Sequence, residues 1–353
     1  MLNTNDFFDR LSQQGYTHLC AVPCSFAKNI INASINNSSK ITYIPCASEA
    51  VACSVAAGLK MSGKRPIVIV QSSGLTNMGS CMTSLLKPYD VKFPVIVSWR
   101  TYKEGDSEIQ HQHLSTELPK LISAYGYKHH ILDSQNLSNA INQINDSDKS
   151  HTICIIEKDT FDRVELKKEY QLDVTDYIAR SEFLISLNDT FKEQNVLLIG
   201  TTGNTAREMY SFMPDTDNFY MAGNMGGALS IGFGAAIAGK KVVVCGGDAE
   251  FVMHMGGLTT AGREAEKIDL TYILFDNEQN KSTGGQNTYQ KHLDYIGIAK
   301  SVGFDTYDKV VTSIKDFKSI IRNVSGLKFV SVKCGVDDET PRPPLDIVKR
   351  SML

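Results

Sequence analysis

Short apolar runs alternate with helical patterns along the first half of the chain. The apolar runs predict strands at 17–23, 41–46, 65–71, 93–99 and 152–157. Between them, the spacing of apolar and small residues predicts helices at 25–36 and 49–62. Strands that alternate with helices in this way pair in parallel and are buried on both faces by the crossover helices. The first half therefore predicts an α/β unit.

The second half repeats this alternation. Its strand-like runs are 195–201, 241–247, 270–277 and 327–335. The intervening segment 158–180 is charged and carries no strand-like run, which is typical of an inter-domain linker with some helix. We therefore predict two doubly wound parallel-sheet α/β domains of duplicated architecture, at 1–165 and 181–353, joined by a linker at 166–180.

Composition and charge narrow the class of protein. The 353 residues are 42% hydrophobic and 21% charged, with a formal net charge of −3, so nothing indicates a nucleic-acid partner. No apolar run reaches the roughly 18 residues of a membrane span. The N-terminal segment predicts an amphipathic helix rather than a signal peptide. The eight cysteines are scattered without a CxxC pair, which favours buried thiols in a reducing cytoplasm over a zinc site or disulfides.

Parallel α/β sheets bind ligands at the carboxyl ends of their strands. The loops predicted there hold most of the conspicuous Gly, Ser, Thr and Asn residues, and lie at 23–28, 46–50, 71–80, 98–113, 201–207, 221–228, 246–256 and 277–288.

The stretch 242-VVVCGGDAEF-251 ends a predicted strand in two glycines and a carboxylate. Alone, it is more typical of a tight turn than of a ligand site. However, Asn277 ends the next predicted strand, and a helix over about 251–266 would fill the crossover between the two. Oxygens of Asp248 and Asn277, with a backbone carbonyl just after Asn277 that we assign to Gln279, suit Mg²⁺.

Two further loops would face the same edge of the second sheet. They are 200-GTTGN-204 and 223-GNMGGALS-230. Hydroxyl groups and amides at the starts of helices in such loops bind phosphates. We therefore expect Thr201, Thr202, Gly203 and Asn224 to contact phosphate groups next to the magnesium ion.

Taken together, these residues resemble the signature of thiamine-diphosphate enzymes, in which a Gly-Asp-Gly turn is followed about thirty residues later by Asn. Here Gly247, Asp248, Ala249 and Glu250 form the turn, with Ala249 where the family usually has Gly. The resemblance implies that this turn binds the cofactor. It also implies an apolar prop for the bent cofactor, for which Met225 is well placed; core packing is the alternative role for Met225.

The resemblance further implies a glutamate from the other domain. This glutamate protonates the aminopyrimidine ring and so promotes removal of the C2 proton. Glu49, in 46-CASEAVACSVAAG-58, follows a predicted strand and begins a helix of small residues. A helix-terminal acid that interacts with the helix dipole is the structural alternative.

Further segments resemble the phosphonopyruvate and sulfopyruvate decarboxylase group. They are 22-VPCS-25, 47-ASEAVACSVAAG-58, 71-QSSGLTN-77, 98-SWR-100, 110-QHQH-113, 201-TTGNTARE-208, 223-GNMGGALSIG-232 and 281-KSTGGQNT-288. This group lacks the central third domain of larger relatives, which fits the chain length. The resemblance implies nonoxidative decarboxylation of 3-phosphonopyruvate to phosphonoacetaldehyde. Alternatives are the sulfopyruvate reaction, another 2-keto acid decarboxylase or carboligase, and a noncatalytic α/β protein.

A substrate with an anionic tail requires cationic and hydrogen-bonding groups. Candidate substrate-binding residues are Cys24, Ser25, Arg100, Gln110, Lys281 and Ser282. Arg100 would bind a phosphonate through two hydrogen bonds, although a surface ion pair is equally expected. His111 and His113 are candidates for donating to the substrate or moving a proton. The HxH spacing also suits a metal, but no third ligand accompanies it.

In this family the two domains of one site come from different chains. The resemblance therefore implies that Glu49 and Asp248 meet across a homodimer, or a higher oligomer.

Overall fold

The computed structural model describes residues 1–100, 109–338, 340–350 and 352–353. Residues 101–108 of the predicted loop 98–113 lie outside the described residues. Two compact units make up the chain. Unit 1 contains residues 1–171 and 283–287, and unit 2 contains residues 172–282 and 288–353. Among the described residues, no helix is long and apolar enough to cross a membrane.

Unit 1 is built on a six-stranded parallel sheet of order β2-β1-β3-β4-β6-β5. The strands are β1 (His18–Ala21), β2 (Thr42–Pro45), β3 (Pro66–Gln71), β4 (Val95–Ser98), β5 (Lys128–Ile131) and β6 (Thr152–Ile156). The α-helices are α1 (Thr4–Gln13), α2 (Lys28–Asn36), α3 (Glu49–Met61), α4 (Ser72–Leu75), α5 (Gly79–Cys81), α6 (Ile109–Ala124) and α7 (Leu137–Ser147). Shorter turns are η1 (Ser25–Ala27), η2 (Thr76–Met78), η3 (Met82–Leu86) and η4 (Lys168–Tyr170).

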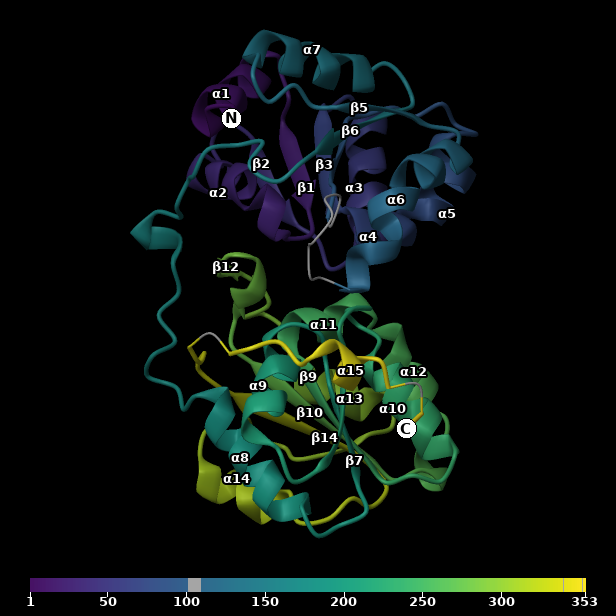
Figure 1. The fold of residues 1–353 in the computed structure, drawn as a ribbon, viewed down its shortest axis with the longest axis vertical. Coiled ribbons are helices and arrows are strands. Elements are labelled where there is room, and N and C mark those ends of the chain that lie inside the picture. The colour runs from purple at the N-terminus through teal and green to yellow at the C-terminus, as the bar shows by residue number, and fades with distance from the viewer. Residues whose placement is uncertain (101–108, 339, 351) are drawn as a thin grey trace. The chain divides into compact units, whose positions relative to one another are not determined.

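Alternate residues of each strand in unit 1 pack on opposite faces of the sheet. In β3, Ile67 and Ile69 pack with α1, α2 and α7, whereas Val68 and Val70 pack with α3, α5 and α6. The same helices flank the sheet in Figure 1. Burial on both faces is the reason that these strands are continuous apolar runs in the sequence.

Unit 2 contains a second six-stranded parallel sheet, of order β13-β14-β10-β9-β7-β8. Its strands are β7 (Leu197–Gly200), β8 (Asp217–Tyr220), β9 (Val242–Gly247), β10 (Leu270–Asp276), β13 (Asp305–Thr306) and β14 (Leu327–Lys333). The α-helices are α8 (Arg180–Phe191), α9 (Asn204–Phe212), α10 (Ala228–Ile237), α11 (Asp248–Met253), α12 (Gly256–Gly262), α13 (Tyr295–Ser301), α14 (Ile314–Ile320) and α15 (Leu345–Val348). Short elements of unit 2 are η5 (Ala265–Lys267) and β11 (Gln279–Asn280). The segment 283–287, which includes β12 (Gln286–Asn287), belongs to unit 1, and η6 (Lys281–Thr283) lies at the boundary.

The two units have the same topology. In each, the first strand lies beside the second on one side and the third on the other, and the sheet continues through the fourth and sixth strands to the fifth. The predicted duplicated, doubly wound α/β fold is therefore confirmed. In unit 2, α8, α9 and α14 contact one face of the sheet and α10, α12 and α13 the other.

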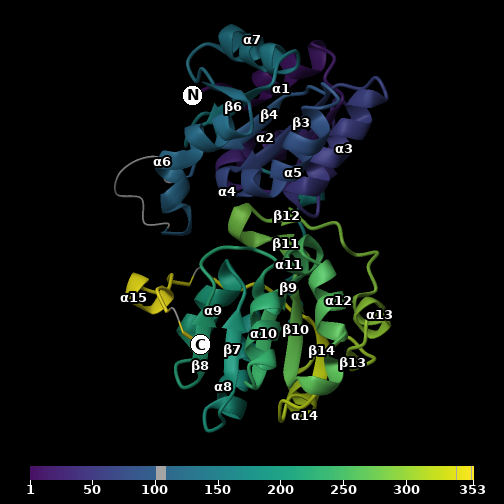
Figure 2. The same cartoon turned by 90° about the vertical axis from the view of Figure 1, so that its right-hand side faces the viewer.

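Two expectations differ from the structure. The sequence patterns did not predict β5, β8 and β13, which lie at or near sheet edges; Figure 2 shows β8 and β13 at the two edges of their sheet. The crossover expected as one helix over 251–266 is instead α11 and α12, separated at His254 and Met255. The two glycines at 256–257 weaken a continuous helix there.

Candidate active site

The two carboxyl-terminal strand ends predicted to hold a cation are neighbours. β9 and β10 pair in parallel, with Gly247 opposite Phe275. Asp248 and Asn277 therefore leave adjacent strands at the same edge of the unit 2 sheet. Both side chains are buried, with 3% and 4% of their surface exposed.

Asp248 is held by two hydrogen bonds. The backbone N–H of Ala249 donates to Oδ1 (2.9 Å), and the hydroxyl of Thr288 donates to Oδ2 (3.0 Å). Burial, and then the nearby Asp276 carboxylate, raise the pKa of Asp248. A bound cation would offset the cost of burying this carboxylate and would lower its pKa again. The sequence patterns did not single out Thr288, because its role depends on a contact across forty positions.

The oxygen-rich character of the site suits Mg²⁺ rather than a transition metal. Among the described residues there is no group of three or more His, Cys, Asp or Glu that could hold a metal ion. Asp248 and Asn277 would supply one carboxylate and one amide oxygen, and Mg²⁺ takes its other ligands from phosphates and water. The side chain of Gln279 is engaged, since its Nε2 donates to the carbonyl of Leu172 (2.8 Å), which leaves its backbone carbonyl as the candidate ligand.

The loop after β7 has the features expected of a phosphate-binding loop. The hydroxyl of Thr201 is buried without a hydrogen-bond partner among the described residues, as expected of a group that awaits a ligand. Thr202 instead donates to the carbonyl of Ala222 (2.8 Å) and thereby ties this loop to the one after β8. Gly203 has φ +94°, and a Cβ there would lie 3.4 Å from Oγ of Ser282. The structure thus brings the 201–203 loop and Ser282 together.

The glycine-rich loop after β8 is tightly packed. Asn224 has φ +58°, and its side chain occupies the space that a Cβ on Gly227 would need. A Cβ on Gly226 would meet the ring of His254 at 2.8 Å, so His254 lies against this loop, a contact that the sequence did not indicate. Met225 is half-buried, which is compatible with either of its expected roles.

Ala249 and Glu250 belong to the first turn of α11. The helical backbone at Ala249 requires no glycine, which explains why alanine is accommodated there. The carboxylate of Glu250 accepts a hydrogen bond from the hydroxyl of Tyr272 (2.7 Å) in the core of unit 2. Burial raises the pKa of Glu250 to about 7. Its predicted contact with the cofactor stays a prediction.

Glu250 should make the apoprotein less stable as the pH rises. The folded state favours the protonated acid, so its stabilising contribution is complete below the ordinary value of 4.5 and is lost as the pH rises through about 7. This pKa difference corresponds to roughly 3 kcal/mol. We expect Glu250→Gln to remove that part of the pH dependence, measured as the difference between wild-type and variant unfolding free energies at about pH 4 and pH 8. Parallel pH profiles of the two proteins would contradict it.

In unit 1, Glu49 is the first residue of α3 and only 6% exposed. The amide of Asn77 donates to its Oε2 (2.8 Å). A Cβ on Gly74 would lie 2.2 Å from its Oε1, so the absence of a side chain at Gly74 makes room for this carboxylate. Ser48 caps the helix by accepting from the N–H of Val51. Asn77 and Gly74 therefore orient Glu49 at the carboxyl edge of the sheet.

Arg100 lies at the same edge of unit 1, just after β4, and is 7% exposed. Its guanidinium donates to the hydroxyl of Ser25 and lies over the ring of Phe26, 4.3 Å from the centroid. Its backbone N–H donates to the hydroxyl of Ser72 (3.4 Å). The structure thus brings Arg100 and Ser25 together.

Cys24 extends this polar group. Its thiol lies 2.9 Å from the hydroxyl of Ser98 and donates to Oε1 of Gln71 (3.6 Å). Nε2 of Gln71 in turn donates to the hydroxyl of Ser73 (2.6 Å). The sequence singled out Cys24 but gave no role to Gln71 and Ser98, whose place in the group depends on the pairing of β3 with β4.

The two candidate histidines differ in exposure. His111 is 6% exposed in the first turn of α6, whereas His113 and Gln110 are exposed. Residues two apart in a helix face in different directions, so His111 and His113 do not converge on one ligand. α6 packs against α4, the element that follows β3, and His111 is therefore the better placed candidate. Lys281 is exposed.

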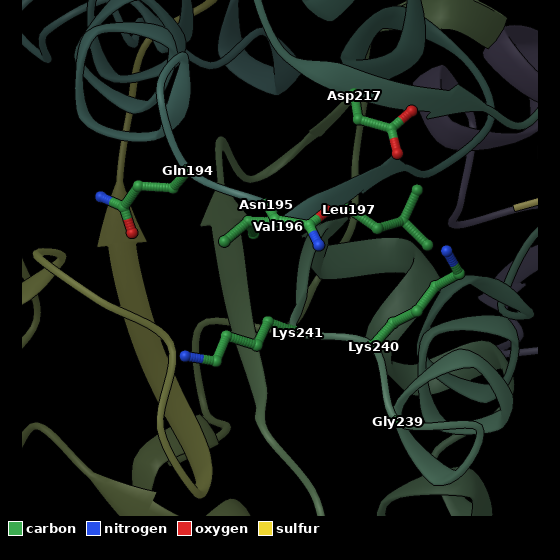
Figure 3. Close-up of a pocket in the computed structure, with 8 residues that line it drawn as sticks. All are labelled: Gln194, Asn195, Val196, Leu197, Asp217, Gly239, Lys240 and Lys241. Carbon is green, nitrogen blue, oxygen red and sulfur yellow. The ribbon is translucent and has the colours of Figure 1, made fainter.

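A polar pocket of about 420 Å³ lies in unit 2 (Figure 3). It is lined by Gln194, Asn195, Val196, Leu197, Asp217, Gly239, Lys240 and Lys241. These residues precede or begin β7, β8 and β9, so the pocket lies at the amino ends of the strands. The predicted chemistry lies at the opposite ends.

Family models decide the class of protein. The N-terminal TPP binding domain of thiamine pyrophosphate enzymes matches residues 3–118, and the C-terminal TPP binding domain matches residues 199–332. The chain belongs to the thiamine pyrophosphate enzymes, in the phosphonopyruvate and sulfopyruvate decarboxylase group. It is a carboxy-lyase that uses thiamine diphosphate, the same compound as thiamine pyrophosphate.

Curated relatives span most of this enzyme. A phosphonopyruvate decarboxylase of Streptomyces viridochromogenes is 26% identical over 99% of this chain and 94% of its own length. A sulfopyruvate decarboxylase of Methanosarcina acetivorans is 24% identical over 88% of this chain and 86% of its own. In Methanocaldococcus jannaschii the sulfopyruvate enzyme is divided into a beta subunit, 32% identical over 42% of this chain, and an alpha subunit, 29% identical over 26%.

The residues of unit 2 fit the cofactor that the family uses. Thr201 supplies a buried hydroxyl without a partner in the described part of the chain, and Asp248 a buried carboxylate at the start of α11. Gly247 carries no Cβ, and no neighbouring heavy atom lies within 4 Å of the position that a Cβ would take, so this turn leaves space for a ligand. A diphosphate with its cation would satisfy the hydroxyl and neutralise the carboxylate.

Proposed function

We propose that this enzyme decarboxylates 3-phosphonopyruvate to phosphonoacetaldehyde and CO₂, using thiamine diphosphate and Mg²⁺. The observation that carries the proposal is the buried guanidinium of Arg100, held at the carboxyl edge of unit 1 by Ser25 and Phe26. A planar guanidinium forms two charge-assisted hydrogen bonds with a phosphonate. The hydroxyl of Ser25 and the Cys24–Ser98 pair lie next to it and would complete the pocket for the anionic tail.

When bound, thiamine diphosphate supplies the electron sink of the decarboxylation. Asp248, Asn277 and the carbonyl of Gln279 would hold Mg²⁺, and Thr201 would donate to the diphosphate. Glu49, oriented by Asn77, would hold a proton at the ring nitrogen of the aminopyrimidine. Met225 would support the bent cofactor. His111 would exchange a proton with the reacting substrate, while Lys281 and Ser282 would contact its charged end.

Sulfopyruvate is the second candidate substrate, because relatives of both kinds cover most of the chain. The presence of both domains in a single chain does not distinguish the two candidate substrates, since the sulfopyruvate decarboxylase of Methanosarcina acetivorans also matches along most of its length. The tails differ in charge, and a guanidinium favours the more highly charged phosphonate. The reaction chemistry at the keto acid end is common to both.

We further propose that the active enzyme is a homodimer in which Glu49 of one copy serves the diphosphate site of the other. Glu49 lies in unit 1, and Asp248 and Asn277 lie in unit 2. In the family, two chains supply these two halves of one site.

A CO₂-release assay with thiamine diphosphate and Mg²⁺ tests the substrate. It compares phosphonopyruvate, sulfopyruvate and pyruvate, and we expect the highest kcat/KM with phosphonopyruvate. A higher value with sulfopyruvate would replace the proposed substrate. If the enzyme releases CO₂ from none of the three compounds, the proposed reaction is excluded.

Arg100→Met should lower kcat/KM for phosphonopyruvate by about 10- to 100-fold, since a charge-assisted hydrogen bond contributes about 1.5–3 kcal/mol. The value for pyruvate, which has no anionic tail, should change little. Arg65→Met is the matched control, because Arg65 pairs with Asp148 elsewhere in unit 1. Equal losses for both substrates would remove Arg100 from the tail-binding pocket.

A further inference from the structure

The turn after β10 carries the candidate metal ligands in a strained backbone conformation. Glu278, between Asn277 and Gln279, has φ +56° although it is not a glycine. Such a conformation persists only where the surrounding structure fixes it. The contacts of this turn should therefore show what holds Asn277 and the carbonyl of Gln279 in place.

Backbone and side-chain hydrogen bonds hold the turn at several points. The N–H of Glu278 donates to Oδ1 of Asp276 (3.1 Å), and its carbonyl accepts from the N–H of Thr288 (2.9 Å). Thr288 also donates through its hydroxyl to Asp248 (3.0 Å). The turn and the candidate metal carboxylate are thus linked through one residue.

Lys333 is the cation that holds the two acids of the turn. It ends β14 directly opposite Asp276 of β10, and its side chain is 13% exposed. Its ammonium lies 2.9 Å from Oδ2 of Asp276 and 2.5 Å from Oε1 of Glu278. The ring of Tyr177 covers it, with the centroid 5.4 Å away. One half-buried ammonium therefore bridges the residues before and after Asn277.

We propose that Lys333 is a positioning residue for the divalent cation of the cofactor site. The inference rests on the proposed metal ligands Asp248, Asn277 and Gln279. Lys333 fixes the strained turn by bridging Asp276 and Glu278, and so sets the spacing of the amide and carbonyl oxygens. It also neutralises two carboxylates that would otherwise repel each other beside Asp248.

Metal selectivity follows from this rigidity. Mg²⁺ requires near-octahedral geometry at short distances, whereas Ca²⁺ accepts more ligands in flexible arrangements. A turn released from Lys333 would lose Mg²⁺ affinity more than Ca²⁺ affinity. General destabilisation of unit 2 would lower both together, so the ratio of the two affinities reports the positioning role.

The test is calorimetric titration of Mg²⁺ and of Ca²⁺ into the full-length protein with thiamine diphosphate. We expect Lys333→Met to lower Mg²⁺ affinity by about 10- to 100-fold, as loss of a supporting contact at a metal site does, and to narrow the Mg²⁺/Ca²⁺ ratio. Lys333→Arg should retain most of the Mg²⁺ affinity and most of the Mg²⁺/Ca²⁺ affinity ratio of the wild type. Lys300→Met is the control, because Lys300 pairs with Asp308 on an exposed surface of unit 2 and should leave both unchanged.

Two further variants keep the result unambiguous. Glu278→Gln retains the size of the side chain and removes one ion pair, so it should narrow the ratio even if Lys333→Met does not fold. If Lys333→Met or Glu278→Gln keeps the wild-type Mg²⁺ and Ca²⁺ affinities and their ratio, while Asp248→Asn loses metal binding, the positioning role of Lys333 is overturned. The proposed metal site itself would stand in that case. Wild-type Mg²⁺ affinity in Asp248→Asn would overturn the proposed metal site and this inference with it.

Discussion

Replacing Glu49 with glutamine should lower kcat for CO₂ release by about 10²- to 10⁴-fold, the range that a positioned acid or base contributes. Glutamine keeps the size of the side chain and can accept the hydrogen bond from Asn77, but it cannot hold the proton that the aminopyrimidine requires. Folding and thiamine diphosphate affinity should remain close to those of the wild type. The measurements are steady-state turnover and a cofactor titration.

Gly74→Ala is a companion variant to Glu49→Gln. Its Cβ would lie within 2.2 Å of Oε1 of Glu49, so the carboxylate must move although its chemistry is intact. We expect kcat to fall by a smaller factor than in Glu49→Gln. Gly58→Ala, in the exposed part of α3 with open space around it, is the control and should keep wild-type turnover. Wild-type CO₂ release by Glu49→Gln would end the assignment of Glu49 as the catalytic acid.

Asp248→Asn should weaken Mg²⁺-dependent cofactor binding by more than about 100-fold, beyond the loss that supporting residues at metal sites cause. The amide keeps the size of the side chain but loses the charge that attracts the ion. Because burial and Asp276 raise the pKa of Asp248, wild-type Mg²⁺ affinity should fall as the pH drops below neutrality and protons compete for the carboxylate. Titrations at several pH values check both effects, and unchanged affinity in Asp248→Asn would exclude the residue as a ligand.

Mixing these two inactive variants tests the proposed dimer. After subunit exchange, half of the dimers would contain one chain of each kind, and each of these would contain one intact site if Glu49 and Asp248 of a site come from different chains. About a quarter of wild-type activity should then return. A site built within one chain would give no recovery, because each chain would carry one defect.

The sequence predicted every interior strand of the two sheets but, of the four edge strands, only β2, for a physical reason. Interior strands such as β3 and β9 are buried on both faces and are therefore continuous apolar runs. β5 has the sequence KHHI and β8 has DNFY, and both are partly solvated edge strands. Their apolar content is too low to distinguish them from a loop, and only pairing with β6 and β7 identifies them as strands.

The candidate site was predictable where it depended on strand order alone. Asp248 and Asn277 were expected to be neighbours because consecutive crossovers place their strands side by side, and the pairing of β9 with β10 agrees. Thr288, Gly74 and Lys333 were not predicted. Thr288 lies 40 positions from Asp248, Gly74 lies 25 positions from Glu49, and Lys333 lies 57 positions from Asp276. No local sequence pattern records contacts over such separations.

The repeated strand order of the two units has a consequence for folding. Each six-stranded sheet is assembled from one continuous stretch of sequence, with its strands supplied by residues 18–156 or 197–333. Nucleation of one sheet therefore requires no strand from the other, and a nascent chain can complete the first sheet before the second has been synthesised. Calorimetry of the apoprotein should then resolve two unfolding transitions, and a core substitution such as Val68→Ala should shift one of them.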